Sequence, residues 1–438
     1  MKNRNTVFTH DHHTLSRVPL NERVDLFTTC IVRIGATTSL VQFMLGATLG
    51  HSMTFSQAMI ATILGSILLE FISLGLGIAG TREGLSTSLL SRWCGFGYFG
   101  SALIGGIISI STLGWFGVQN AIVANGVVSA MGLEKHHYAF YVVAAISGLL
   151  LSALVAFGFK GLSWIAKTAL PLFFLVVGWI FYQILKNYDI YHLFTMEPLG
   201  SPLSISAAAT AVAGGYIAFA IISPDMSRYC KNGMHVFWMI TSSIFVGEFI
   251  VNGISILVAH ALNTDNVVEI MTQGAGWIGL FSVLLSAVKI NDLNLYSSVL
   301  GFSNFLSVIT RKKWHYAGLT LFLGMTGTFI SMTGILERFI PFLIMLGVLF
   351  PPVAGIMLVD YYILRTHRAL LELTRCQGNL PDIESIQKTG MTAIIAWIGG
   401  SMVGFTIEWG IPSLNSLISA SVIYWFICIF NKKYSFFK

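Results

Sequence analysis

The chain has 438 residues, of which 55% are hydrophobic and only 10% are charged, and its formal net charge is +6. An average soluble domain carries about 25% charged residues. This composition therefore excludes a soluble globular protein and indicates a polytopic membrane protein, whose mean hydropathy is +0.76.

Long apolar runs define the predicted elements, because about 20 apolar residues span a bilayer. We predict an all-α integral membrane protein with twelve transmembrane helices in one domain, residues 27–430, between cytoplasmic tails at 1–26 and 431–438. The N-terminal tail is long and polar, so we expect no cleavable signal peptide. The predicted spans lie near residues 27–50, 55–79, 97–127, 138–159, 162–185, 204–224, 235–262, 275–305, 315–333, 337–364, 391–409 and 413–430.

Lysine and arginine are unevenly distributed over the predicted loops. Most of the 25 fall in the two tails and in loops on the same side as the tails, whereas the opposite loops hold only Lys135, Lys186 and Arg338. Positive residues gather on the cytoplasmic side of membrane proteins. We therefore predict a multi-pass protein of the cell membrane with both termini in the cytoplasm. The same bias explains the positive charge, so we expect no nucleic-acid partner.

The five cysteines do not indicate a disulfide framework, because their number is odd and each falls in a span or on the reducing side. The histidines His10, His12 and His13 lie in the polar tail, where we expect no metal site. We expect no cofactor either. A membrane-embedded enzyme needs a nucleophile–base pair or metal ligands at one depth, and the pattern offers neither. A channel is disfavoured because the polar residues form a complete set within one chain; the oligomeric state stays open.

Spans one and six are predicted to be discontinuous, because glycine and proline interrupt the helical hydrogen bonds and free backbone is tolerated only where it lines a cavity. Two broken helices five spans apart are typical of inverted repeats that hold a substrate midway through the membrane. The alternative is that the glycines only permit close helix packing. The residues concerned are Gly35, Gly46 and Gly50 around Thr37, Thr38, Ser39 and Gln42 in span one, and Gly214, Gly215 and Pro224 in span six.

Candidate ligand-binding residues lie in spans one, three and six. In span three, Trp115 and Gln119 are four residues apart and share a helix face. An indole and an amide suit a flat heterocycle, which needs a ring to stack on and a group to read its edge; the alternative is ordinary packing. In span six, Tyr216 is a second stacking candidate, and freed amides near Gly215 are candidate donors. Gln42 of span one completes this set.

The inner end of span six carries Asp225 and Arg228, three residues apart. We expect them to form ion pairs with another inner loop that open and close during transport. The alternative is simple solvation of a loop, because exposed pairs contribute little.

Span eight carries the densest group of polar residues, Lys289-Ile290-Asn291-Asp292-Leu293-Asn294. Ionisable groups at membrane depth are costly unless they are paired or face water, so this run is a candidate ligand site. Asn291 and Asn294 share a face, and amides both donate and accept. The alternative is a clasp between helices in which Asp292 neutralises Lys289.

Several motifs together resemble the nucleobase–cation symport-1 family, in its cytosine/purine permease branch. The resemblance covers nearly the whole chain in order. It implies a leucine-transporter-type fold with a 5+5 inverted repeat and alternating-access import of a nucleobase. The matching motifs are Val18-Pro19-Leu20-Asn21-Glu22-Arg23, Gly114-Trp115-Phe116-Gly117, Asp225-Met226-Ser227-Arg228-Tyr229, Asn291-Asp292-Leu293-Asn294-Leu295-Tyr296 with Leu300-Gly301-Phe302, and the run from Pro351-Pro352-Val353-Ala354-Gly355 to Asp360-Tyr361.

The resemblance also implies roles for single residues. The family's stacking aromatics of spans three and six fall on Trp115 and Tyr216. An amide of span three falls on Gln119, and the asparagines of span eight fall on Asn291 and Asn294.

One departure from the family pattern concerns the coupling ion. Sodium-coupled members carry hydroxyl residues just before the span-eight asparagine, where this chain has Lys289 and Ile290. We therefore predict coupling to protons, or facilitated exchange, rather than sodium symport; the alternative is a sodium symporter of the same cargo. Lys167 in span five is a second candidate for the cation's place, unless it extends to the inner interface.

The predicted cargo is a small planar nitrogen heterocycle such as cytosine or a purine. Allantoin, a hydantoin or a vitamin-like pyrimidine is the alternative within transport, because the same residue types recognise any of these.

Overall fold

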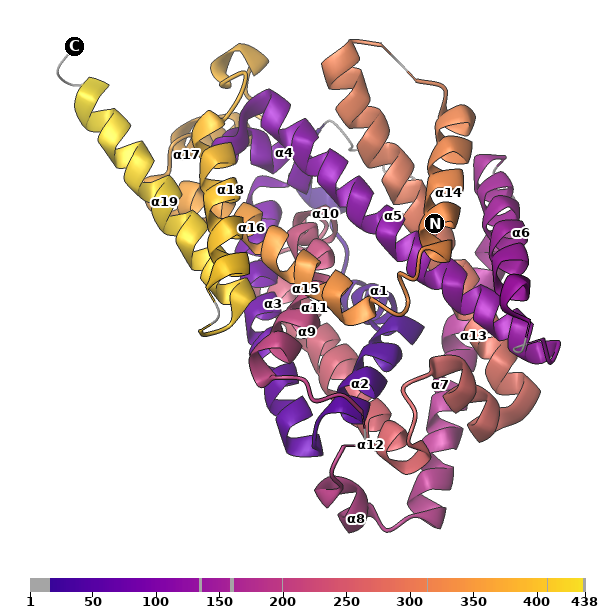
Figure 1. The fold of residues 1–438 in the computed structure, drawn as a ribbon. Helices are drawn as coiled ribbons and strands as arrows, with labels where there is room; N and C mark the ends of the chain where they lie inside the picture. Colours follow the sequence, from indigo (N-terminus) through magenta and orange to yellow (C-terminus); the bar gives the residue numbers. More distant parts are fainter. Residues whose placement is uncertain are drawn as a thin grey trace.

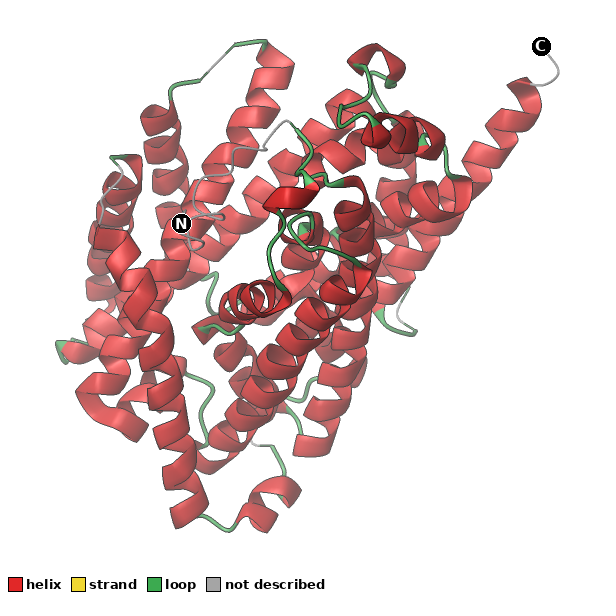
Figure 2. Cartoon of the chain, turned by 180° about the vertical axis from the view of Figure 1, so that it is seen from behind, coloured by secondary structure: helices red, strands yellow, loops and turns green. Residues whose placement is uncertain are grey.

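The computed structural model shows a helical chain (Figures 1 and 2). In the part of the chain that the structure describes, the β-type pairing is limited to one isolated bridge between Val24 and Cys230. The described residues are 16–133, 136–157, 161–198, 200–312, 314–407 and 409–435, without the side chains of 137, 161–167, 383 and 432–435. The histidines at 10, 12 and 13 lie outside this description.

The helices follow one another through mostly short connections. Two of them, η4 and η5, are wider π-helical turns inside longer helical segments, whereas η3 contains a kink at Cys94 and Gly95. The elements are η2 (Leu20–Glu22), α1 (Leu26–Thr37), α2 (Leu40–Ser52), α3 (Phe55–Glu83), α4 (Thr87–Ser91), η3 (Arg92–Phe96), α5 (Gly97–Ala130), α6 (His137–Ala156), α7 (Gly161–Asn187), α8 (Ile190–Thr195), α9 (Ile205–Ile221), α10 (Ser223–Ser227), α11 (Gly233–Ile244), η4 (Phe245–Val251), α12 (Asn252–Leu262), α13 (Val267–Thr310), α14 (Tyr316–Met332), α15 (Phe339–Leu349), α16 (Pro351–Leu358), η5 (Val359–Leu364), α17 (Arg368–Cys376), η6 (Ile383–Ser385), α18 (Met391–Thr406) and α19 (Pro412–Ser435).

The helices confirm an all-α membrane protein. Among the described residues, 8 helices are long and apolar enough to cross a membrane, or up to 9 if α1 and α2 form one bent span. Three shorter apolar helices, α9, α14 and α18, have 17, 17 and 16 residues and fall at the other predicted spans.

The predicted break in span one is confirmed. The chain leaves helical geometry at Thr38 and Ser39, and α1 and α2 are bent by 53° across this point. The side chain of Asp25 accepts the Thr28 backbone N–H at 3.1 Å and so caps the start of α1. The break frees backbone groups in the interior of the bundle, where they need partners.

The predicted break at Gly214-Gly215 is wrong, because α9 runs through both glycines and ends only at Ile221. A Cβ on Gly214 would lie 1.8 Å from the carbonyl oxygen of Leu343 in α15. This glycine therefore permits close packing of two helices, which was the alternative reading. The interruption predicted at Pro224 agrees with the structure, because α9 ends at Ile221 and α10 begins at Ser223 with Pro224 in its first turn.

The long helices α5 and α13 pack against each other and form a seam through the molecule (Figure 1). Small residues allow this approach: a Cβ on Gly301 would lie 2.5 Å from the carbonyl oxygen of Gly105. Ser109 Oγ donates to the Ser298 carbonyl at 2.6 Å. The helix α13 kinks at Gly276 (φ 56°, ψ −139°) and is regular beyond it, so the polar run of span eight lies on an unbroken helix.

Candidate functional site

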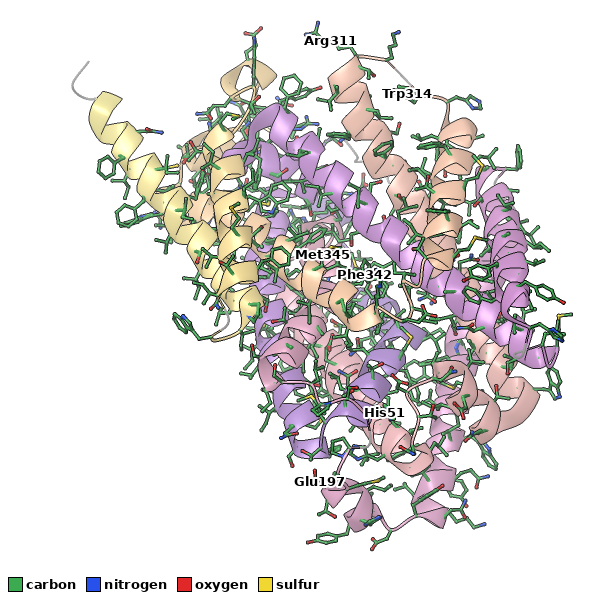
Figure 3. All side chains as sticks on the ribbon, viewed as in Figure 1. His51, Glu197, Arg311, Trp314, Phe342 and Met345 are labelled. Carbon is green, nitrogen blue, oxygen red and sulfur yellow. The ribbon has the colours of Figure 1, made fainter. Side chains whose placement is uncertain are left out.

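Trp115 lies on α5 against two phenylalanine rings and is 9% exposed. Its ring meets Phe342 at 5.3 Å and Phe339 at 6.1 Å between centroids, both edge to face. Both phenylalanines come from α15; Figure 3 labels Phe342 near the middle of the molecule. These are edge-to-face contacts, one of the preferred arrangements of aromatic pairs, and neither phenylalanine is stacked parallel to the indole.

Gln119 lies one helical turn after Trp115 and is completely buried. Neither its amide nitrogen nor its amide oxygen has a hydrogen-bond partner among the described residues. An unpaired buried amide costs several kcal/mol of desolvation, so native proteins rarely leave one without a reason. Its neighbour Asn120 shows the opposite: its amide donates to the Ala144 carbonyl and to Ser331 Oγ, both at 2.9 Å, and accepts from Ser147 Oγ at 2.8 Å.

Asn291 and Asn294 bring further unpaired polar atoms to α13. Asn291 is completely buried and donates to the Phe116 carbonyl of α5 at 3.3 Å, so it lies beside the turn that carries Trp115. Its amide oxygen and the amide nitrogen of Asn294 have no partner in the described part of the chain. The amide nitrogen of Asn291 thus forms a hydrogen bond between helices, as the helix-clasp alternative expects. One acceptor, on Asn291, and one donor, on Asn294, stay without a partner among the described residues.

Tyr216 lies at the break of span one. Its hydroxyl donates to the Thr37 carbonyl at 2.5 Å and lies 3.0 Å from Ser39 Oγ. The phenol therefore satisfies a carbonyl that the break has released. Gly215 packs toward α2, where its missing Cβ would lie 3.4 Å from Leu45. Because α9 is unbroken, Gly215 does not supply the freed amides that we predicted.

Gln42 is bound to other side chains. Its amide nitrogen donates to Glu248 of η4 at 2.9 Å and to Asn252 of α12 at 2.6 Å. The structure thus places Gln42 in a link between helices rather than on the seam of α5 and α13. The sequence analysis missed Glu248, although a lone acidic residue in an apolar span is itself a signal of function.

Lys289 and Ile290 occupy the positions where sodium-coupled family members carry hydroxyl residues, and both lie next to the break of span one. Lys289, Ile290 and Ser286 of α13 line a small pocket of about 10 Å³ with residues of the break and of α7. This free volume is about that of a single water. Lys289 and Asp292 form no ion pair among the described residues, so the fixed pair of the clasp alternative is not observed. The other lining residues are Thr38, Ser39, Leu40, Ala169, Leu170 and Phe173. The side chain of Lys167 lies outside the described part of the chain.

Asp225 lies in α10, just after α9, and Arg228 directly follows α10. Asp225 accepts from Thr87 Oγ1 of α4 at 2.8 Å, and Arg228 Nε donates to the Asp225 carbonyl at 3.2 Å. Arg228 is only 2% exposed, and its guanidinium lies 5.2 Å from the centre of the Tyr229 ring. The alternative of simple loop solvation is therefore wrong for Arg228.

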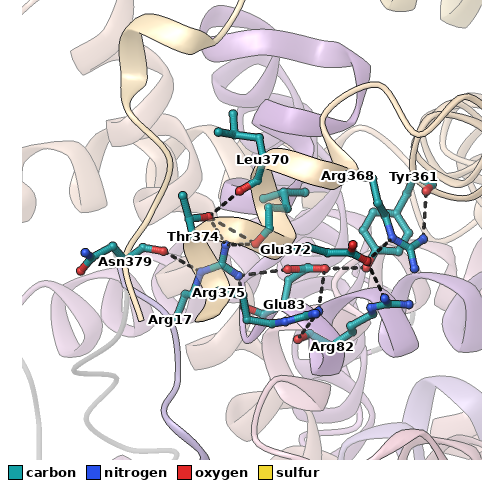
Figure 4. A network of polar contacts seen from close by, with 11 residues as sticks. Arg17, Arg82, Glu83, Tyr361, Arg368, Leu370, Glu372, Thr374, Arg375 and Asn379 are labelled. Carbon is teal, nitrogen blue, oxygen red and sulfur yellow. Dashed lines mark hydrogen bonds and ion pairs between the residues drawn. The ribbon is translucent and has the colours of Figure 1, made fainter. Parts of the chain in front are cut away.

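A second polar network joins the N-terminal segment to the end of α3 and to α17 (Figure 4). Arg17 and Glu83 form a buried ion pair at 3.1 Å, and Tyr361 donates to the same carboxylate at 2.8 Å. Arg375 lies 3.3 Å from it. The remaining donors of Arg17 reach Asn379, Leu371 and Thr374. The sequence analysis counted Arg17 only as a positive charge of the tail, because its partners are distant in sequence.

Comparison with known proteins supports a transporter. Residues 17–427 match the family model described as permease for cytosine/purines, uracil, thiamine and allantoin. Cytosine permease of Escherichia coli K12 is 25% identical over 408 residues, which cover 93% of this chain and 92% of the relative. Purine-uracil permease NCS1 of Arabidopsis thaliana is 21% identical over 84% of this chain and 69% of the relative.

The fold is that of Mhp1, a nucleobase–cation symport-1 family transporter. Its inward-facing structure matches with a TM-score of 0.77 at 16% identity, covering 95% of this chain and 93% of Mhp1. Its closed structure with bromovinylhydantoin bound matches with a TM-score of 0.67 at 18% identity, covering 94% and 93%. The chain therefore belongs to the nucleobase–cation symport-1 family, as its motifs indicated, and is a multi-pass membrane transporter rather than an enzyme.

Proposed function

We propose that this protein imports a nucleobase such as cytosine or a purine by alternating access. The observation that carries the proposal is the set of buried, unpaired amide atoms of Gln119, Asn291 and Asn294 on the seam between α5 and α13. A nucleobase edge alternates donors and acceptors, and these amides offer both.

Stacking supplies the second part of recognition. Trp115 lies one helical turn from Gln119, and its contacts with Phe339 and Phe342 are edge to face rather than parallel stacks, so in this proposal the flat ligand supplies the parallel ring. A stacked base contributes about 1–3 kcal/mol. Tyr216 forms the opposite wall in this proposal, and its bond to the Thr37 carbonyl ties that wall to the break of span one. The relatives named as cytosine and purine-uracil permeases support the cargo class.

We further propose twelve spans in a 5+5 inverted repeat followed by two helices, with both termini in the cytoplasm. The three short apolar helices lie at the predicted positions, and 17 residues is within the range of a spanning helix. Figure 3 shows Arg311 at one end of the molecule and Glu197 toward the other, which agrees with basic residues on the proposed inner side.

Coupling follows the proton gradient, or transport runs as facilitated exchange, in this proposal. Lys289 lines the small pocket at the break of span one, together with Ser39 and Ser286. A tethered ammonium group there opposes binding of a metal cation at the same place, because like charges a few ångströms apart repel strongly at low dielectric. A sodium symporter of the same cargo is the alternative.

A related heterocycle is the second candidate cargo. It is favoured by the fold match to Mhp1 with a hydantoin bound and by the family description, which includes allantoin and thiamine. A hydantoin also carries alternating amide donors and carbonyl acceptors, so the unpaired amides fit it as well.

The test combines binding and uptake. Purified protein is screened by thermal shift against cytosine, uracil, purines, allantoin, a hydantoin and thiamine, because a specific ligand stabilises by mass action. Uptake of the best ligand is then measured in proteoliposomes without sodium, with an imposed pH gradient. Stabilisation by cytosine or a purine and saturable uptake support the proposal. Stabilisation by a hydantoin alone selects the second candidate, and strict dependence on sodium overturns the coupling.

A further inference from the structure

The buried carboxylate of Glu248 is not used in the proposed recognition of the cargo. It lies in η4, inside the apolar span Gly233–Leu262, and is 4% exposed. Among the described residues no cationic group lies within ion-pair distance of it. A carboxylate at membrane depth without a cation is costly, and such residues mark ion and proton pathways.

The hydrogen bonds around Glu248 lack a donor. Both hydrogens of the Gln42 amide are used, one toward Glu248 and one toward Asn252. The Asn252 amide donates to Thr62 Oγ1 at 3.4 Å, and Thr62 itself donates to the Ala58 carbonyl. The amide oxygen of Gln42 is buried and has no partner in the described part. A carboxylic acid has an O–H where a carboxylate has only acceptors, so one proton on Glu248 would add the missing donor.

Other ionisable groups near η4 do not neutralise Glu248. The elements packed against η4 are α1, α2, α3, α11 and α12. Their buried or half-buried ionisable side chains bond elsewhere: Arg33 donates to Ser223 and lies over Phe219, Glu70 accepts from Thr241, and His260 bonds the Leu193 and Met53 carbonyls. The remaining ones on these elements are Cys30, His51, Arg82, Glu83 and His235, none of which has a hydrogen bond or ion pair to Glu248 in the described structure. The hydroxyl of Tyr216 on α9 bonds the Thr37 carbonyl and lies near Ser39 Oγ rather than Glu248.

Glu248 is connected to the break of span one on two sides. Gln42 lies in the first turn of α2, just after the break. Gly247, the residue before Glu248, packs closely against Thr37: a Cβ added to this glycine would lie 3.3 Å from the Cβ of Thr37. The backbone carbonyl of Thr37 also accepts the hydrogen bond from the Tyr216 hydroxyl. The π-helical turn that carries Glu248 is a geometry found frequently at functional sites.

We propose that Glu248, with Gln42 and Asn252, is a proton-binding site that links proton movement to the bending of span one. The carboxylate takes one proton from the outer side, which removes its charge and adds the missing donor, and returns that proton to the cytoplasm. No bond other than the O–H bond forms or breaks. This role rests on the proposed transport function. In it, Lys289 stays positively charged throughout the cycle, and Glu248 is the group that gains and loses the proton.

The first experiment detects the proton directly and does not depend on transport. Infrared spectra of the purified wild-type protein are recorded from acidic to alkaline pH and compared with those of Glu248→Gln. We expect a carboxylic acid carbonyl band at neutral pH that shifts in heavy water and is missing in Glu248→Gln. The control is Glu70→Gln, because Glu70 is a half-buried carboxylate of α3 that bonds Thr241 instead. A wild type without the band, or a band that Glu248→Gln keeps, overturns the proposal.

The second experiment measures coupling in proteoliposomes. One coupled proton gives up to about tenfold accumulation per unit of pH difference. Glu248→Gln is expected to lose this accumulation while it keeps exchange of cargo across the membrane, and Glu70→Gln is expected to keep both. Unchanged accumulation in Glu248→Gln overturns the proposal. If Glu248→Gln does not fold, Glu248→Asp, which keeps the acid on a shorter chain, is expected to shift the pH midpoint of uptake; an unshifted midpoint overturns it.

The two experiments separate this proposal from the proposed function. A wild type that transports no nucleobase contradicts the proposed cargo, and the infrared band still decides whether Glu248 holds a proton. A wild type whose accumulation ignores the pH gradient overturns the coupling role even if the band is present.

Discussion

Two buried polar regions of this protein differ in how completely their groups are paired. The network around Arg17 and Glu83 joins three distant parts of the chain, and the guanidinium and carboxylate have several partners each (Figure 4). The seam between α5 and α13 leaves amide atoms of Gln119, Asn291 and Asn294 without partners among the residues that the structure describes. Paired groups hold a structure together, whereas unpaired buried ones await a ligand or water. This difference predicts that mutations in the two regions affect different measurements.

The largest expected effect is on stability and comes from Arg17→Ala. It leaves the buried Glu83 carboxylate with only Arg375 and Tyr361, and removing one partner of a buried ion pair typically costs about 3–5 kcal/mol. We expect a much lower thermal midpoint in detergent, measured by the unfolding of the purified protein. Ligand affinity in the surviving folded protein should be unchanged. An unaltered midpoint would show that the network does not hold the N-terminal segment, α3 and α17 together.

The next effect is on affinity and comes from Trp115→Ala. Loss of one stacked ring should weaken binding by about 1–3 kcal/mol, roughly 5- to 150-fold. The measurement is ligand binding to purified protein, with surface expression as the control. Tyr216→Ala should act in the same direction, and Tyr216→Phe should show how much of it comes from the hydroxyl bond to Thr37. If both alanine variants bind normally, the site lies elsewhere.

The neighbours Gln119 and Asn120 allow the sharpest form of the comparison. Asn120→Leu breaks three hydrogen bonds and should destabilise the ligand-free protein by about 1–3 kcal/mol. Gln119→Leu removes only unpaired atoms, so the ligand-free protein should be as stable as the wild type or more so, while ligand affinity falls. Thermal midpoints with and without ligand test both. A loss of stability in Gln119→Leu equal to that in Asn120→Leu would contradict the comparison.

Asn291→Ala tests the edge contacts. A site built to bond a polar edge rejects analogues that lack it, because its own buried groups would stay unpaired. We expect weaker binding and poorer discrimination between related bases, measured by competition with a panel of nucleobases. An unaltered competition profile would exclude this role for Asn291.

Run length predicted the elements well, because membrane thickness fixes the length of a spanning helix. The predicted span 55–79 is α3 (Phe55–Glu83), and the predicted break in span one lies at Thr38 and Ser39. The sequence could not tell whether Gly214-Gly215 breaks span six, because a glycine pair is compatible both with a break and with a close helix contact. The distinction depends on what lies next to the glycine in the folded protein, and next to Gly214 lies the Leu343 carbonyl of another helix.

The candidate site was less accessible from sequence than the fold. The polar residues of spans three and eight were found, since amides are rare in apolar runs. Their unpaired atoms are a property of the packed structure, as Gln119 and Asn120 show. The pairing of Arg17 with Glu83 joins segments 66 residues apart, which no local pattern reveals. Glu248 was missed because the analysis sought groups of polar residues rather than a single acid.

A smaller effect is expected from Lys289→Thr, which replaces the tethered cation by a hydroxyl. The variant should change the pH dependence of uptake and should gain stimulation by sodium of about fivefold, the lower end of typical coupling. Uptake with and without sodium at several external pH values tests this. Ser286 stays in place as a second hydroxyl of the pocket. A wild type that strictly requires sodium would return Lys289 to a structural role, and a variant that changes only expression would exclude a coupling role.

The smallest effect is expected from Glu372→Gln, the exposed counterpart of Glu83. The hydrogen bond from Arg368 lowers the pKa of Glu372, as does the charge of Arg82. A lowered pKa means that the ion pair stabilises α17 above the ordinary pKa of a glutamate and is lost as the pH falls through the lower value. The pair is therefore fully formed at neutral pH, yet solvent screens it, and exposed pairs contribute little. We expect the thermal midpoint of Glu372→Gln to match the wild type at neutral pH. A loss as large as that in Arg17→Ala would show that charge pairing as such, rather than burial, sets the strength of the network around Arg17 and Glu83.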